Sequence, residues 1–189
     1  MKKFTQDELL TQRAKIIELL RSTKRENIEL LIKFLDKSKY FFCYGSFRHH
    51  TYVGGLAEHS LEILNNAIEH NKNSPIESII IASLMHDLCK VSYVFPDELQ
   101  EYFRGHGTKS VRILEDYIGF KLTDEERRAI RFHMGSKCNL TTERDKLEYK
   151  QAQKEELWEL IHIGDCISCG YFPKFMHSTI KGVIKSLKL

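Results

Sequence analysis

The sequence predicts an all-α fold, because apolar residues recur at helical spacing along most of the chain and period-two alternation is almost absent. Local signals mark the helix ends: Thr123-Asp124-Glu125-Glu126 is a capping box, and Gly119 and Gly135 are stop signals. A chain of 189 residues is long enough for one well-cored domain and short for two. We therefore expect a single helical domain over residues 1–189, with N-terminal helices in 1–39, a core over about 40–170 and a C-terminal helix over 173–189.

The first part of the chain contains two expected amphipathic helices, over residues 7–21 and 26–35. Between residues 39 and 55 the helical pattern gives way to a connector rich in aromatic residues and glycine. Such a connector is typical either of a functional loop or of a packed link. A third helix is expected over 56–70, and the spacing of its apolar residues places His59 in packed surroundings.

Residues 76–88 are almost wholly apolar, so a helix here has no polar face and is expected to be buried. Ser74-Pro75-Ile76-Glu77 predicts its start, as a capping box with proline at the first helical position. His86 and Asp87 lie at its end. A buried carboxylate without a partner is costly, so Asp87 should pair with a cation, and the adjacent imidazole favours a metal ion. For a lone His-Asp pair, an ordinary polar helix end is the plainer explanation.

The second half of the chain continues the helical pattern. We expect a helix over 109–118 and another after the Thr123 capping box, with His133 near the end of the latter. Residues 136–146 are polar and loop-like. Strong helical periodicity returns over 154–170, where Asp165 lies on the apolar stripe.

The charge balance names no partner by itself. The chain has 29 basic and 26 acidic residues, a formal net charge of +3, which is too close to neutral to indicate a nucleic-acid-binding protein. No apolar run approaches the roughly 20 residues that a spanning helix needs, so no membrane association is expected.

The five cysteines form an odd set, and the polar N-terminal residues do not resemble a secretory signal. We therefore expect a cytoplasmic protein with reduced thiols. Cys166-x-x-Cys169 has the spacing of half a zinc site, but a second close pair is missing. Small buried thiols within a helix are the more ordinary explanation.

Helices that are widely separated in the sequence each bring nitrogen or carboxylate groups to an interior face, as metal-binding helix bundles do. Taken singly, each histidine is also typical of a satisfied core residue. Imidazole and carboxylate together suit manganese, iron, zinc, nickel or cobalt, and Asp87 is placed to bridge two ions. The candidate ligands are His59, His86, Asp87, His106, His133 and Asp165.

The order His, His-Asp, Asp resembles the HD-domain superfamily of metal-dependent phosphohydrolases, over roughly residues 40–170. This resemblance implies an HD-type helical bundle with a metal site between helices. It assigns metal binding to His59, His86, Asp87 and Asp165, and it matches His106 and His133 to the further histidines of two-metal members. Lys90 matches a lysine that often follows the family's dipeptide.

A closer likeness lies in residues 49–60, His-His-Thr-Tyr-Val-Gly-Gly-Leu-Ala-Glu-His-Ser. This segment is similar to the His-His-x-Tyr-x-Gly-Gly-Leu-x-x-His segment of bacterial HD-domain 3′-to-5′ exoribonucleases. Those enzymes carry an OB-fold where this chain has about two helices. Their double histidine near the fourth helix corresponds here to His133-Met134.

The resemblance implies a metal-dependent phosphohydrolase, a phosphomonoesterase or phosphodiesterase that cleaves a nucleotide or short oligonucleotide with two divalent ions. Asp87, Lys90 and His50 are the expected catalytic residues, and Arg48, His49, His50 and Lys90 the expected substrate contacts. One alternative is a non-catalytic metal-containing module that binds a nucleotide. Another is a single-ion site in which His106 and His133 bind phosphate.

Overall fold

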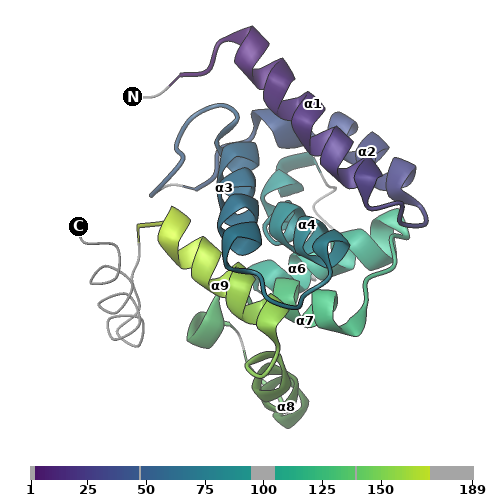
Figure 1. Ribbon diagram of the computed structural model, residues 1–189, viewed down its shortest axis with the longest axis vertical. Helices are drawn as coiled ribbons and strands as arrows, with labels where there is room; N and C mark the ends of the chain where they lie inside the picture. The colour runs from purple at the N-terminus through teal and green to yellow at the C-terminus, as the bar shows by residue number, and fades with distance from the viewer. Residues whose placement is uncertain (1–2, 47, 95–104, 139, 171–189) are drawn as a thin grey trace.

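The structure is a computed structural model that describes residues 3–46, 48–94, 105–138 and 140–170. Every regular element in those ranges is helical, which confirms the all-α prediction (Figure 1). None of the described helices is long and apolar enough to cross a bilayer. The α-helices are α1 (Gln6–Ser22), α2 (Ile28–Lys37), α3 (Gly55–His70), α4 (Ile76–Met85), α6 (His106–Arg112), α7 (Asp124–Arg131), α8 (Glu143–Ala152) and α9 (Glu156–Ser168). Shorter pieces are the 3-10 turns η1 (Tyr40–Phe42), η2 (Leu88–Val94) and η4 (Gly135–Lys137), and the π-helix η3 (Ile113–Ile118).

Helix α4 is the centre of the fold. Every residue from Ser78 to Met85 is buried, as the apolar sequence predicted, and α4 contacts α1, α3, α7 and α9. The buried Tyr40 hydroxyl links α4 to α3, because it lies 2.8 Å from the Leu84 carbonyl oxygen of α4 and 3.0 Å from Ser60 Oγ of α3. The C-terminal end of α4, where His86 and Asp87 follow, is therefore held against α3.

Helix α4 begins at Ile76 as predicted, but the predicted capping needs a correction. Pro75 is the N-cap residue and no side chain caps the helix, so the capping box proposed for Ser74–Glu77 is wrong. The Ser74 hydroxyl instead donates to Glu156 Oε2 at 3.1 Å, and the same carboxylate accepts from the Lys72 and Asn73 amides. The Ser74 hydroxyl, which the local sequence pattern assigned to capping α4, is therefore bonded to Glu156 of α9 instead.

A second correction concerns residues 136–146, which the polar composition assigned to a loop. Helix α8 begins within that range, capped by the Thr142 side chain in a capping box with Asp145. Because the only buried residues of α8 are Asp145 and Ala152, the helix has no apolar stripe to reveal it. Arg131 of α7 forms ion pairs with Asp145 and Glu148, and Tyr149 and Ala152 supply the apolar contact of α8 with the core.

Helices α3 and α9 lie side by side, and α6 approaches the end of α7 (Figure 1). Gly107 makes the second contact possible: a Cβ atom there would lie 2.2 Å from the Arg131 carbonyl oxygen. The expected helix over 109–118 is observed as the end of α6 followed by the π-helix η3. The expected C-terminal helix over 173–189 lies outside the described residues.

Candidate metal centre

Four of the predicted ligands, from three parts of the fold, meet in the interior. His59 comes from α3, His86 and Asp87 follow α4, and Asp165 comes from α9. His59 Nε2 lies 3.2 Å from His86 Nε2 and 3.2 Å from Asp165 Oδ1, and His86 Nε2 lies 3.3 Å from Asp87 Oδ2. All four residues are less than a tenth exposed. We call these four residues the cage.

His133 adds a third imidazole beside the cage. It lies just beyond the end of α7, fully buried, with Nε2 3.6 Å from Asp87 Oδ1. Asp87 therefore presents one carboxylate oxygen to His86 and the other to His133. His133 Nε2 has no hydrogen-bond partner among the described residues. A buried nitrogen left in this way is a strong indication of a missing ligand.

The orientation of two imidazoles follows from their backbone partners. His86 Nδ1 lies 2.8 Å from the Ser83 carbonyl oxygen, and His133 Nδ1 lies 2.7 Å from the Ile130 carbonyl oxygen. Because a carbonyl oxygen can only accept, both Nδ1 atoms carry a proton and donate it. In the neutral rings, the Nε2 lone pairs of His86 and His133 are then directed at the centre.

In His59 too the proton is on Nδ1, but here side chains rather than a backbone carbonyl place it there. The Ser168 hydroxyl donates to Glu62 Oε2 at 2.5 Å, since a carboxylate only accepts. Ser168 Oγ has then used its proton, so it accepts from His59 Nδ1 at 2.8 Å. His59 Nε2 is left with its lone pair towards the cage. Glu62 and Ser168 are functional candidates that the sequence reasoning missed.

These groups fit a divalent cation. Metal-binding histidines usually donate their second ring nitrogen to a carbonyl or carboxylate, as all three imidazoles do here, directly or through Ser168. The separations of 3.2 to 3.6 Å between facing atoms are close to the edges of about 3.0 to 3.4 Å expected around an ion with bonds of about 2.1 Å. The buried carboxylates of Asp87 and Asp165 supply the negative charge.

The charge of each cage residue depends on its charged neighbours. Burial acts to raise the pKa of Asp87, but the positive charges of His86 and Lys90 hold it well below its usual range. Burial lowers the pKa of His133 to about 4, so this ring is neutral at physiological pH. Burial opposes a charge on His86, yet the Asp87 carboxylate outweighs it and raises the pKa of His86. A metal ion and that proton would compete for the same Nε2 lone pair.

The expected catalytic and substrate residues lie at different depths. The Lys90 ammonium pairs with Asp87 Oδ2, and the Lys90 side chain is 18% exposed. His50 Nε2 lies 3.1 Å from Glu62 Oε2. Arg48 is exposed on the loop before His49. Their catalytic and substrate-binding roles stay predictions.

His106 is not part of this cluster. It is the first residue of α6, its side chain is exposed, and it belongs to none of the ligand groups found among the described residues. Its backbone is nevertheless near the end of α7, through the close approach at Gly107. Its role as a metal ligand stays a prediction.

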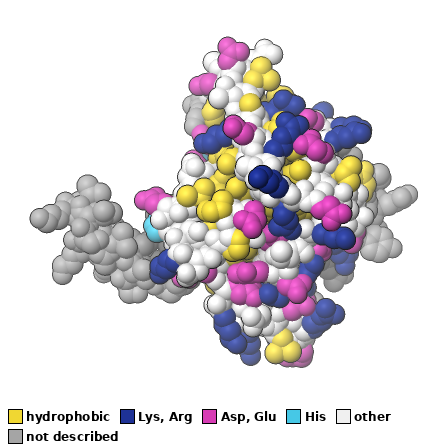
Figure 2. All heavy atoms as spheres, turned by 45° about the vertical axis from the view of Figure 1, so that its right-hand side comes forward, with side chains coloured by type: hydrophobic (Ala, Val, Ile, Leu, Met, Phe, Trp, Pro, Cys, Tyr) yellow, Lys and Arg dark blue, Asp and Glu magenta, His cyan; other side chains and the backbone are white. Residues whose placement is uncertain are grey.

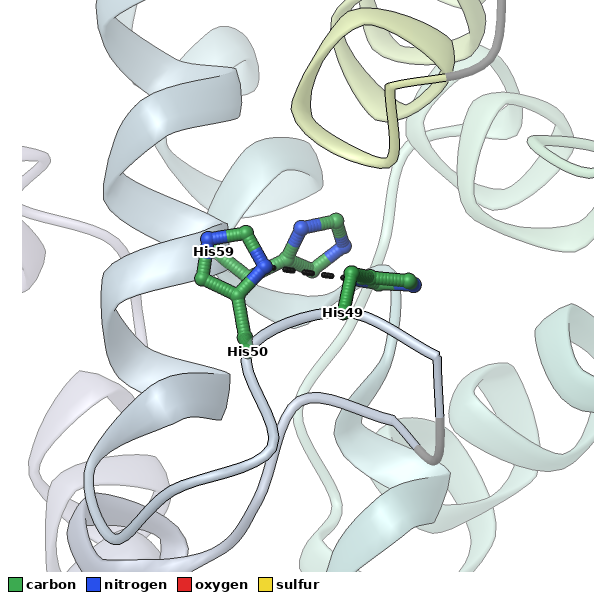
Figure 3. A group of neighbouring side chains, drawn as sticks. All are labelled: His49, His50 and His59. Atoms are coloured by element: carbon green, nitrogen blue, oxygen red, sulfur yellow. Dashed lines mark hydrogen bonds between the residues drawn. The ribbon is translucent and has the colours of Figure 1, made fainter. Parts of the chain in front are cut away.

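The loop carrying His49 and His50 is folded tightly against the start of α3 (Figure 3). The Gly45 amide donates to the His50 carbonyl at 2.9 Å, and a Cβ atom on Gly55 would lie 2.1 Å from that oxygen. Glycine at positions 45 and 55 therefore allows the loop to turn both imidazoles towards His59. The ring centroids of His49 and His59 are 5.0 Å apart.

Cys169 is a further residue that the sequence reasoning did not place in the site. Its Sγ lies 3.1 Å from His49 Nε2 and 3.3 Å from Asp165 Oδ1, and it groups with His59 and Asp165. Cys166 is buried and belongs to no ligand group of the described residues, so the two cysteines do not act as a zinc pair there. The available signal was the four-residue spacing from Asp165 to Cys169, which puts both on one helix face.

Comparison with protein families gives one finding: the family model described as HD domain matches residues 56–160. The matched range contains His59, His86, Asp87 and His133 and ends before Asp165. Comparison with curated proteins gives no match, and comparison with solved structures gives none either.

Proposed function

The chain belongs to the HD-domain family, and from this premise we propose that it is a metal-dependent phosphohydrolase. The observation that carries the proposal is the cage, in which His59 Nε2 faces the His86 imidazole and the carboxylates of Asp87 and Asp165 in the interior. Such a donor set without an ion would leave buried charge and lone pairs poorly compensated. The specific reaction that we propose is hydrolysis of a phosphoester in a nucleotide or short oligonucleotide.

When bound, a divalent cation supplies an acidified water and neutralises phosphate oxygens. His59, His86, Asp87 and Asp165 would hold it, with Glu62 and Ser168 fixing the ring of His59. Asp87 is the group placed to accept a proton. The Lys90 ammonium, already beside Asp87, would contact a phosphate oxygen. His50, Arg48 and His49 are proposed to contact the rest of the substrate.

Two ions rather than one are proposed, because the two oxygens of Asp87 face different imidazoles. His133 and, from sequence, His106 would complete the second position. His133→Ala and His106→Ala should each lower the number of bound ions per chain by about one, as measured by elemental analysis at saturating Mn²⁺. If wild type binds one ion and both variants still bind one, these histidines contact phosphate around a single ion instead.

A small substrate is favoured over a long nucleic acid. On the face drawn in Figure 2, Lys and Arg side chains are interspersed with Asp and Glu, so that face offers no continuous basic track. The net charge of +3 is in line with this. The likeness of residues 49–60 to an exoribonuclease segment makes short oligonucleotides a reasonable substrate class to include.

The test is a panel of mono-, cyclic and oligonucleotides assayed with Mn²⁺, Fe²⁺, Ni²⁺, Co²⁺, Zn²⁺ and Mg²⁺. Asp87→Asn should lose bound metal and at least about a hundredfold in turnover, more than the 10- to 100-fold typical of outer-shell changes. Asp116→Asn, at an exposed position on η3, is the matched control. Full metal content and turnover in Asp87→Asn would overturn the proposal. Nucleotide binding without turnover in wild type would favour the non-catalytic module.

A further inference from the structure

Two side chains of α9 bind successive carbonyl oxygens at the end of α7. Trp158 Nε1 donates to the Phe132 carbonyl oxygen at 2.9 Å, and His162 Nδ1 donates to the His133 carbonyl oxygen at 2.6 Å. Because a carbonyl oxygen only accepts, the His162 ring carries its proton on Nδ1. The two donors are four residues apart on one face of α9, and their rings stack with centroids 5.0 Å apart and planes 15° apart. We call Trp158 and His162 the aromatic pair.

The end of α7 needs such donors. The helix ends at Arg131 with Phe132 as its C-cap, and the last carbonyl groups of a helix have no partner within the helix. Phe132 and His133 are both buried, so their carbonyl oxygens need partners from the protein rather than from solvent. The aromatic pair supplies a donor to each of them.

Gly135 makes room for the His162 ring. The φ angle of Gly135 is +60°, and a Cβ atom there would lie 2.6 Å from His162 Cε1. Any side chain at this position would therefore displace the ring from the His133 carbonyl oxygen. The contact between α9 and the residues that follow α7 is close and depends on a glycine.

His133 is consequently held at two points. Its ring Nδ1 donates to the Ile130 carbonyl oxygen at 2.7 Å, and its own carbonyl oxygen accepts from His162. With these two bonds in place, His133 Nε2 lies 3.6 Å from Asp87 Oδ1. His162 also lies three residues before Asp165, so one helix carries both a cage ligand and the donor that holds His133.

Packing alone does not account for an imidazole at position 162. Phe132, Tyr149 and Trp158 already form an aromatic cluster beside it, with ring centroids 5.6 and 5.9 Å apart for the successive pairs. An apolar ring would fill the same half-buried space next to Trp158. Only a donor binds the His133 carbonyl oxygen, so the hydrogen bond is what distinguishes histidine here.

We propose that His162 is a positioning residue of the metal centre, which fixes the His133 imidazole opposite Asp87 before a metal ion binds. The inference rests on the proposed function, in which His133 is a ligand. A ligand that is already in place loses little conformational freedom on binding, and this raises metal affinity. Outer partners of metal-binding histidines change affinity about 10- to 100-fold, and we expect the lower end of that range because His162 acts through the backbone.

Two variants of His162 separate the hydrogen bond from the packing. His162→Phe keeps an aromatic ring beside Trp158 and removes the donor. His162→Asn loses the ring but keeps an N–H donor at the δ position, so it should restore the bond. His70→Phe is the matched control, because His70 Nδ1 also bonds a backbone carbonyl oxygen, that of Asn66 at 2.9 Å, at the exposed end of α3.

The Mn²⁺ affinity of the full chain, measured by competition with a chelating dye, tests the inference without any substrate. His162→Phe should bind Mn²⁺ about tenfold more weakly than wild type, while His162→Asn and His70→Phe should stay within about twofold of it. In a His133→Ala background, His162→Phe should change the affinity by less than about twofold, because the ligand through which it acts is gone. A general loosening of the fold would lower the affinity in both backgrounds.

Proton exchange in the metal-free chain gives a second readout. The His133 Nδ1 proton is buried and bonded to the Ile130 carbonyl oxygen, so it should exchange slowly with water. Its ring N–H resonance in ¹⁵N-edited NMR is identified by its loss in His133→Ala. The proton should exchange at least about tenfold faster in His162→Phe and at the wild-type rate in His162→Asn.

Equal Mn²⁺ affinity in wild type and His162→Phe would overturn the inference, and so would an equal loss in the His133→Ala background or an unchanged exchange rate. Mn²⁺ binding with the expected effects but no hydrolysis of any substrate would refute the phosphohydrolase proposal alone. If wild type binds no divalent ion, the proposed function fails, and the exchange rate still decides whether His162 holds the His133 ring.

Discussion

Ser168 is predicted to control metal affinity although it is not itself a ligand. It accepts from His59 Nδ1 at 2.8 Å and donates to Glu62 at 2.5 Å, so it links a buried imidazole to a carboxylate. Ser168→Ala removes both bonds. The His59 ring is then free to move its proton to Nε2, the nitrogen that faces His86 and Asp165. A protonated Nε2 cannot bind a cation.

The size of the effect follows from the two lost contacts. A neutral hydrogen bond contributes about 0.5 to 1.5 kcal/mol and one to a carboxylate about 1.5 to 3 kcal/mol. Only the part of this free energy that keeps the His59 proton on Nδ1 contributes to metal binding. We therefore expect the metal affinity to fall about 10- to 100-fold, as for other outer-shell partners of metal-binding histidines. This corresponds to about 1.4 to 2.7 kcal/mol.

Competition with a chelating dye measures the affinity for Zn²⁺ or Co²⁺ in wild type, Ser168→Ala and Ser168→Thr. The threonine variant keeps the hydroxyl and should recover most of the affinity. A circular dichroism melt of each metal-free variant checks that the fold is kept. Equal affinity in wild type and Ser168→Ala would refute the argument, because the orientation of His59 would then not depend on Ser168.

The remaining predictions concern stability and turnover. Arg25→Ala should lower the free energy of unfolding by about 3 to 5 kcal/mol, because it leaves the fully buried Glu126 carboxylate without its cation. Urea denaturation measures this, and Arg21→Ala, which breaks an exposed pair, should change the value by less than about 1 kcal/mol. Lys90→Ala and His50→Ala should each lower kcat/KM while leaving metal content intact. The expected loss of transition-state stabilisation is about 1 to 3 kcal/mol. Unchanged kcat/KM in both variants would remove them from the substrate site.

Helix positions and the burial of α4 were accessible from sequence because their causes are local. Apolar spacing, the Thr123 capping box and the Gly119 stop act within a few residues, and the structure confirms them. Gly135 does not end α7 as expected, because that helix already ends at Arg131 with Phe132 as its C-cap. Local rules failed where a distant group intervened. Ser74 bonds to Glu156 rather than capping α4. Helix α8 has no full apolar stripe and is held by ion pairs from Arg131 together with two core contacts, from Tyr149 and Ala152.

The sequence by itself determined that the chain is helical and that its motifs match a metal-binding family. It also placed five of the six candidate ligands correctly in the interior, while the sixth, His106, is exposed. Only the tertiary structure decided how those groups are arranged around one another. Ser168 meets His59 across 109 residues, and Cys169 meets His49 across 120. Spacing along one helix predicts a shared face, but it carries no information on what a second element brings to that face. The orientations of His59 and His49 therefore follow from the packing of α9 and residues 48–50 against α3, whereas His86 and His133 are oriented by carbonyl oxygens three residues earlier in the chain.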